Sequence, residues 1–431
     1  MVMTGTAAAQ VIGFALSPVI SRLFSPSDFG IFGSFNSVSA IIAAAATLEY
    51  TEAIILQKKE EDAINLLIVS CSCTFVVGLL CLSICSLAPA FVNGLMKTEG
   101  YWALALLVAS TLITGLNSSF QVWCVRAKAF KHTSASQVIR SLSGNGMLLG
   151  FGYFKIGAVG LIVGSVMADV LASLNLVRVL LPSLLALWRR IRWDRMKQLA
   201  KEYSDFPMYA ATQNVITTSS QGLPVLLLGH FYGLSVVGAY AFGVSMLSTP
   251  MGFVLRSVRD VLLQRATETH QSGHSLMPLY LKTTAGLFAL GLLPSLVLLI
   301  WAPEIFSLIF GSRWQTAGEF AQSLIVWLFI GFCNVAAVKF AQVIRIQRTI
   351  FYYELAMLIG RTMVLVLGGT YLNAKHTIIL FSLFGATMNL FLIFLVGHSV
   401  MRREKNGAWE GLMETLLEER SGISKARRPL E

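Results

Sequence analysis

The sequence has 431 residues, of which 55% are hydrophobic and only 13% are charged. A soluble domain usually carries about 25% charged residues, so this chain has too few charges to cover its surface in water. The composition therefore excludes a soluble enzyme and predicts an all-α membrane protein, and the net charge of +11 has to be explained in that setting.

Twelve apolar stretches are long enough to cross a bilayer as helices, because a hydrocarbon core of about 30 Å needs about 20 residues. In chain order we expect spans at residues 3–23, 30–49, 64–93, 101–123, 134–154, 157–181, 207–230, 235–262, 283–310, 317–338, 349–373 and 377–400. The first stretch has no basic start and no A-x-A exit, so it is predicted to be a span and not a cleavable signal peptide.

The basic residues lie mainly in every second connection. Connections after even-numbered spans carry basic groups such as Arg189, Arg190 and Arg192, whereas those after odd-numbered spans carry only Lys97, Lys155, Arg313 and Lys375. Since basic loops stay on the cytoplasmic side, both termini are predicted to be cytoplasmic. The positive charge then reflects membrane orientation and implies no nucleic-acid partner.

The longest basic connection, residues 182–206, separates six spans from six. We therefore expect an N-terminal lobe over residues 1–181 and a C-terminal lobe over residues 207–400, facing each other across a central cavity. The tail, residues 401–431, places Trp409, Leu412, Met413, Leu416 and Leu417 at helical spacing. That spacing predicts a short amphipathic helix on the cytoplasmic leaflet.

A short sequence pattern recurs in the two lobes. Phe24-x-x-Ser27-x-Phe29-Gly30-x-Phe32 joins spans one and two, and Tyr232-x-x-Ser235-x-Val237-Gly238-x-Tyr240 joins spans seven and eight. An even number of spans per unit gives a parallel repeat, related by an axis along the membrane normal. The recurrence supports the two-lobe prediction.

Several functional classes lack their sequence signatures. The chain has no G-x-x-x-x-G-K-[ST] motif for ATP, and its expected outer loops are too short for a polymerase site. Its six cysteines lie in or at the end of apolar runs, and no histidines and carboxylates cluster at metal-ligand spacing. We therefore expect no catalytic residues, no metal and no cofactor.

Three stretches resemble a known family: Ile20–Phe32, Ala200–Pro207 and Phe310–Gly318. They are similar to the polysaccharide-biosynthesis transporters, the O-antigen flippase branch of the multidrug/oligosaccharidyl-lipid/polysaccharide exporter superfamily. The resemblance implies a monomeric flippase of the cell inner membrane that acts in lipopolysaccharide or exopolysaccharide synthesis. It would turn undecaprenyl-pyrophosphate-linked oligosaccharide towards the periplasm by alternating access, among membrane lipids and beside polymerase or assembly proteins.

Charged groups within spans are the candidate site residues, because each costs about 2.5–3.5 kcal/mol near the bilayer centre. We predict that Arg140 and Arg361 bind the pyrophosphate, since a guanidinium contacts phosphate oxygens in pairs. Asp169 and Glu354 are predicted proton- or ion-coupling groups. Alternatively, Arg140 pairs with Asp169 inside the first lobe and Glu354 neutralises Arg361.

Other residues leave two interpretations open. Arg256 and Arg259, near the inner end of span eight, either anchor the helix or form a phosphate site at the cavity mouth. Amides within spans suit either sugar hydroxyls or helix–helix hydrogen bonds: Asn36, Asn117, Asn145, Gln213, Asn214, Gln221 and Asn334.

The alternative functions are a multidrug or organic-cation exporter of the same superfamily, a peptidoglycan-lipid flippase, and a membrane-embedded polysaccharide polymerase.

Overall fold

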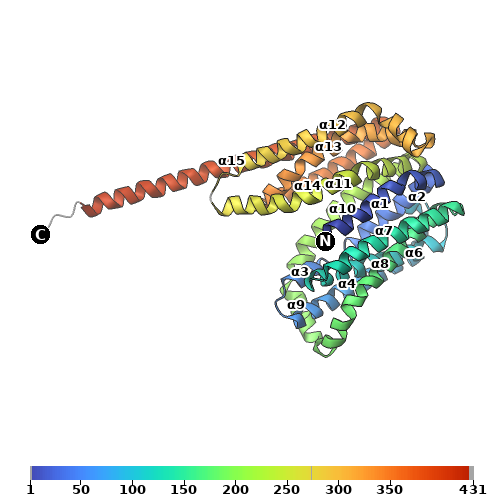
Figure 1. Ribbon diagram of the computed structural model, residues 1–431, viewed down its shortest axis with the longest axis horizontal. Helices are drawn as coiled ribbons and strands as arrows, with labels where there is room; N and C mark the ends of the chain where they lie inside the picture. Colours follow the sequence, from blue (N-terminus) through green and yellow to red (C-terminus); the bar gives the residue numbers. More distant parts are fainter. Residues whose placement is uncertain (1, 273, 427–431) are drawn as a thin grey trace.

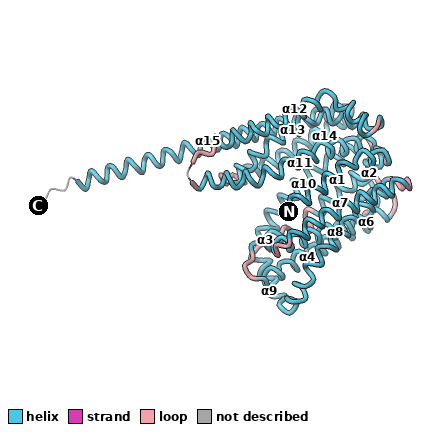
Figure 2. Tube along the Cα trace, viewed as in Figure 1, coloured by secondary structure: helices cyan, strands magenta, loops and turns pink. Residues whose placement is uncertain are grey.

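The computed structural model describes the backbone of residues 2–272 and 274–426, and the side chains of that range except residues 2–10, 256, 257, 260 and 405–426. The described residues contain helices and no strand (Figure 2). In chain order the helices are α1 (Val2–Leu23), α2 (Pro26–Ala43), α3 (Tyr50–Leu56), α4 (Glu60–Leu87), α5 (Pro89–Met96), α6 (Tyr101–Arg126), α7 (Phe130–Tyr153), α8 (Ala158–Leu187), η1 (Trp188–Arg190), α9 (Trp193–Glu202), η2 (Phe206–Ala211), α10 (Thr212–Tyr232), α11 (Leu234–Gln271), α12 (Met277–Phe310), η3 (Ser312–Trp314), α13 (Gln315–Val343), α14 (Gln347–Tyr371) and α15 (Ala374–Ala426).

Each of the twelve expected spans coincides with a long helix. Within the described residues, 8 helices are long and apolar enough to cross a membrane by length and composition. The others are α1, whose segment Val11–Leu23 is apolar but shorter, and α2, α7 and α10, which carry more polar and small residues. The predicted fold class, an all-α protein of about twelve membrane helices, is confirmed.

The helices form two bundles that meet at one end and diverge at the other (Figure 1). One bundle holds α1, α2, α4 and α6 to α8, and the other holds α10 to α15. Helix α2 packs against α10 and α11, so it forms most of the contact between the bundles. We call the end where the bundles meet the closed end, and the opposite end the open end.

Residues 182–206, predicted as a linker, are mostly helical and bound to the first bundle. Arg195 donates to both carboxylate oxygens of Asp62, at 2.7 and 2.9 Å, and Arg190 donates to Glu61 at 2.7 Å. The stretch is therefore the end of α8 followed by η1, α9 and the first residue of η2. In the tail, α15 continues to Ala426 as one helix. The amphipathic face predicted for it lies among side chains outside the described ones.

The second span is shorter than the sequence indicates. Helix α2 ends at Ala43 instead of residue 49, and Leu48 and Glu49 take left-handed φ angles of 48° and 57°. Asn214 of α10 donates to the freed carbonyl of Ala44 at 3.3 Å and to Glu49 Oε1 at 2.7 Å. Apolar composition alone could not show this break, because its polar partner comes from the other bundle.

Replacing Asn214 by alanine should lower the stability of the protein, because the Glu49 carboxylate loses its hydrogen-bond donor. Removing one partner of a charged hydrogen bond costs about 1–3 kcal/mol. The thermal midpoint in detergent should therefore fall relative to the wild type. Gln213→Ala is the matched control, since Gln213 is the exposed neighbour on the same helix. Equal thermal midpoints for the two variants would show that the hydrogen bonds of Asn214 to Ala44 and Glu49 do not stabilise the protein.

Candidate functional site

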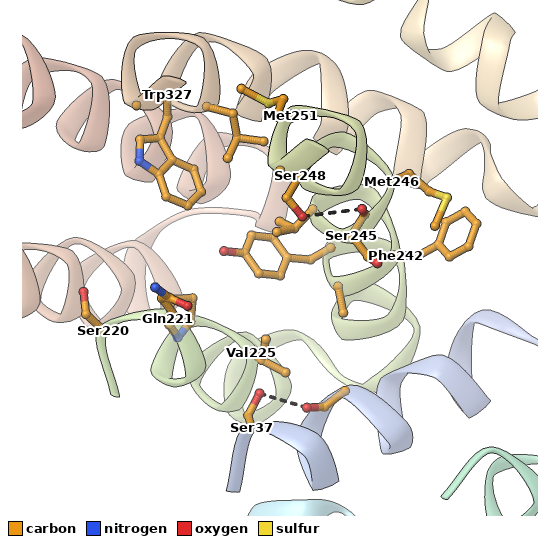
Figure 3. Close-up of a pocket in the computed structure, with 18 of the residues that line it drawn as sticks. Ser37, Ser220, Gln221, Val225, Phe242, Ser245, Met246, Ser248, Met251 and Trp327 are labelled. Atoms are coloured by element: carbon orange, nitrogen blue, oxygen red, sulfur yellow. Dashed lines mark hydrogen bonds between the residues drawn. The ribbon is translucent and has the colours of Figure 1, made fainter. Parts of the chain in front are cut away.

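A cavity of about 940 Å³ lies between the two bundles. Helices α1, α2 and α7 line it from one side, and α10, α11, α13, α14 and α15 line it from the other. Tyr240 and Arg259 of α11 both border it, so it extends along about 28 Å of that helix at 1.5 Å per residue. Figure 3 shows Trp327, Ser248 and Gln221 bordering this space from three different helices.

Polar groups are distributed over the whole cavity wall. The uncharged ones are Ser17, Asn36, Ser37, Asn145, Thr217, Ser220, Gln221, Tyr240, Ser245, Ser248, Asn334, Tyr353 and Asn389. Polar residues of α2 and α10 that border the cavity contribute to the lower hydropathy of these two helices. Of the amides singled out in the sequence, Asn117 instead donates to Ser173 at 2.6 Å, away from the cavity.

Arg361 is the most deeply buried charge on the wall, with 7% of its surface exposed. Its guanidinium carbon lies 4.3 Å from the ring centre of Trp327 and 5.1 Å from that of Phe381. Among the described side chains it has no ion pair, and its Nε has no hydrogen-bond partner. Aromatic rings stabilise a cation but leave its hydrogen-bond donors free, so Arg361 can still bind an acceptor.

Glu354 borders the same cavity two turns before Arg361 on α14. The two side chains interact electrostatically but form no ion pair. Beside them, Asn334 and Tyr353 both donate to Asn389 Oδ1, at 2.8 and 3.1 Å. The Asn334 Oδ1 atom is buried without a partner. This part of the C-terminal lobe thus brings together a cation without an ion pair (Arg361), a carboxylate (Glu354) and amides that can hydrogen-bond to hydroxyl groups.

Arg140 and Asp169 lie elsewhere. The Nε atom of Arg140 forms an ion pair with Asp169 Oδ1, and its second contact, to Oδ2, is 3.3 Å long. Both residues belong to the N-terminal lobe, and neither borders the cavity. The structure thus has the pairing within the first lobe that the sequence left as the alternative. The substrate-binding role of Arg140 and the coupling role of Asp169 stay predictions.

Arg256 and Arg259 lie near the inner end of span eight, on α11. Arg259 is exposed and borders the cavity, which agrees with a site at the mouth. The side chain of Arg256 lies outside the described ones, so its role stays a prediction. Across the described residues, no group of three His, Cys, Asp or Glu could hold a metal ion.

Sequence reasoning missed the aromatic residues around Arg361 and the hydroxyl of Ser220. Trp327 and Phe381 lie in apolar spans and look like lipid-facing residues when read singly. Ser220 belongs to the polar run Thr217-Thr218-Ser219-Ser220-Gln221, which was an available signal within span seven. Its Oγ is buried without a partner and borders the cavity.

Comparison with known proteins gives a family and a fold. A family model described as "Polysaccharide biosynthesis protein" matches residues 19–319. No curated protein matches the sequence. Lipid II flippase MurJ in an inward closed conformation matches with a TM-score of 0.75 and 11% identity, over 97% of this chain and 92% of that chain.

Two conformations of multidrug resistance MATE family transporters of the MOP superfamily also match. The inward-facing one has a TM-score of 0.71 at 14% identity, covering 94% of this chain and 99% of that chain. The outward-facing one has a TM-score of 0.60 at 13% identity, covering 94% of both chains. At these identities the likeness shows the fold, which is that of a MOP superfamily transporter.

Proposed function

The chain belongs to the polysaccharide biosynthesis protein family, and from this premise we propose that it is a flippase for undecaprenyl-pyrophosphate-linked oligosaccharides. The observation that carries the proposal is the charge of the cavity. Its most buried ionic group is Arg361, a cation with free donors and no ion-pair partner among the described residues. A buried charge of this kind is expensive unless a ligand of opposite charge binds it. The pyrophosphate of a lipid carrier meets that need.

The uncharged lining supports a saccharide beside the diphosphate. Amides and hydroxyls such as Asn334, Gln221 and Ser220 match sugar hydroxyls, and Trp327 offers an aromatic face. The volume of about 940 Å³ lies within the range of pockets for small ligands, about 300–1,000 Å³. It suits the headgroup, while the polyprenyl chain stays in the bilayer.

In this proposal Arg259 meets the headgroup at the open end, which is predicted from the basic loops to face the cytoplasm, and Arg361 binds it deeper. Glu354 is the proton- or ion-sensitive partner, because it shares the cavity and interacts electrostatically with Arg361. The coupling role predicted for Asp169 is not used in this proposal, because Asp169 does not border the cavity. An organic-cation exporter is the weaker candidate, because a cationic cargo would be repelled by the most buried charge of the cavity.

The experiment that tests this function is deletion of the gene. Cells without the protein should accumulate lipid-linked repeat units on the cytoplasmic side and lose surface polysaccharide, and the wild-type gene should restore both. Extraction of polyprenyl-linked sugars, followed by mass spectrometry, measures the accumulation. Unchanged surface polysaccharide together with new sensitivity to organic cations would instead favour the exporter.

A further inference from the structure

The two copies of the recurring sequence pattern meet at the closed end of the molecule. A Cβ atom on Gly30 of α2 would overlap the carbonyl oxygen of Leu234 and lie 2.8 Å from its carbonyl carbon. A Cβ atom on Gly238 of α11 would overlap the carbonyl oxygen of Pro26 and lie 2.7 Å from its carbonyl carbon. The two glycines thus allow α2 and α11 to touch backbone to backbone.

The contact is reciprocal in sequence as well as in space. Pro26 stands two residues after Phe24 in the first copy, and Leu234 stands two residues after Tyr232 in the second. Gly30 and Gly238 likewise occupy the same position of the pattern. Each copy therefore contacts its counterpart through the same pair of positions, as expected for a pseudo-two-fold axis between the lobes. A chance crossing of two helices would not preserve this register.

Other contacts between the lobes surround the glycine crossing. Trp314 Nε1 donates to the Ser21 carbonyl at 2.8 Å, and Arg22 donates to the Ile309 carbonyl at 3.3 Å. The rings of Phe29 and Trp314 lie 5.1 Å apart at 87°. Trp314 is fully buried, whereas Phe29 borders the cavity. The ring of Phe29, which lies next to the glycine crossing, thus borders the cavity at this end.

We propose that the two copies of the pattern form a self-complementary gate, and that Gly30 and Gly238 set its closed state. A methyl group at either position meets backbone atoms, which no change of side-chain rotamer can move. The lobes must then separate at this end, so alanine shifts the population towards a state that is open there. The inference assumes that the protein works by alternating access, but it does not depend on the nature of the cargo.

The test measures access to the cavity from the outer side of the membrane. The six native cysteines are replaced, and Ser245, an exposed residue of the cavity wall, becomes the reporter Ser245→Cys. Intact cells are then treated with a membrane-impermeant thiol reagent. Gly30→Ala and Gly238→Ala should each raise the labelling rate on the order of tenfold, as a shift of one decade in the gate equilibrium requires.

Gly146→Ala and Gly286→Ala are the matched controls, because a Cβ at either position has no atom within 4 Å. They should label at the wild-type rate. Labelling of the Gly30 and Gly238 variants at that same rate, with normal amounts of protein in the membrane, would overturn the proposal. Because labelling does not depend on cargo, this result would leave the proposed flippase function untouched.

A second variant covers the case in which the alanine variants do not accumulate. Arg22→Cys with Ile309→Cys places two thiols across the gate, at positions already joined by a hydrogen bond. A short bifunctional methanethiosulfonate, which joins two thiols through reducible disulfide bonds, should link them, stop transport and stop labelling of Ser245→Cys from outside. Reduction of the linker should restore both. Transport that continues after complete cross-linking would show that this end does not open, and would refute the gate.

Discussion

Replacing Arg361 by alanine should reduce transport of lipid-linked oligosaccharide by about ten- to a hundredfold, because a charged hydrogen bond contributes about 1.5–3 kcal/mol. The variant should still fold. Arg361 is buried without an ion pair among the described residues, so its removal relieves a desolvation cost that offsets the loss of its contacts with Trp327 and Phe381. Loss of activity without loss of stability is the signature of a binding residue. Flipping assays in proteoliposomes and thermal midpoints in detergent measure the two quantities.

Replacing Arg361 by lysine distinguishes the effect of the guanidinium's shape from the effect of its charge. The guanidinium lies against the rings of Trp327 and Phe381, and a planar cation fits there and presents several donors to a diphosphate. Arg361→Lys keeps the charge but loses the planar fork, so it should recover only part of the transport. Arg178→Ala is the control, because Arg178 is an exposed arginine of a long helix that does not border the cavity. Full transport by both Arg361 variants would exclude a role in cargo binding.

The sequence predicted the arrangement of helices better than the direction of individual side chains. Hydropathy and the basic loops were sufficient to place twelve spans in two lobes, because bilayer thickness and backbone hydrogen bonding leave few alternatives. The repeated Gly30 and Gly238 patterns indicated the symmetry between the lobes. Depth along a helix follows from counting residues, so Arg361 was recognised as a deep charge, with Glu354 two turns away on the same face.

The face on which a side chain lies could not be predicted in the same way. Arg140 was expected in the cavity because of its depth, yet helix α7 borders the cavity through Asn145 and Leu148. The end of α2 at Ala43 depends on Asn214, a residue far away in the sequence. Both features are set by packing between helices, and a single sequence carries no direct record of that packing.

Replacing Arg140 by alanine should have a large effect on the amount of folded protein, and the effect distinguishes a structural role of Arg140 from a binding role. Arg140→Ala should lower the amount of folded protein, because it leaves Asp169, whose side chain is only 18% exposed, as an unpaired charge within a span. Such a carboxylate costs about 2.5–3.5 kcal/mol near the bilayer centre. Quantitative blotting of membranes and thermal midpoints should both record the loss.

The double variant Arg140→Ala with Asp169→Ala removes both charges of the pair. If the pair is structural, neutralising both partners should restore the folded protein and also its transport, because a neutral pair leaves no buried charge uncompensated. If Arg140 binds the diphosphate, transport should stay low whatever occupies position 169. Rescue of transport by the second substitution would therefore assign cargo recognition to the C-terminal lobe, where Arg361 carries the free cation. If the second substitution does not rescue transport, Arg140 would be a binding residue in a conformation of the lobes that turns its face of α7 towards the cavity.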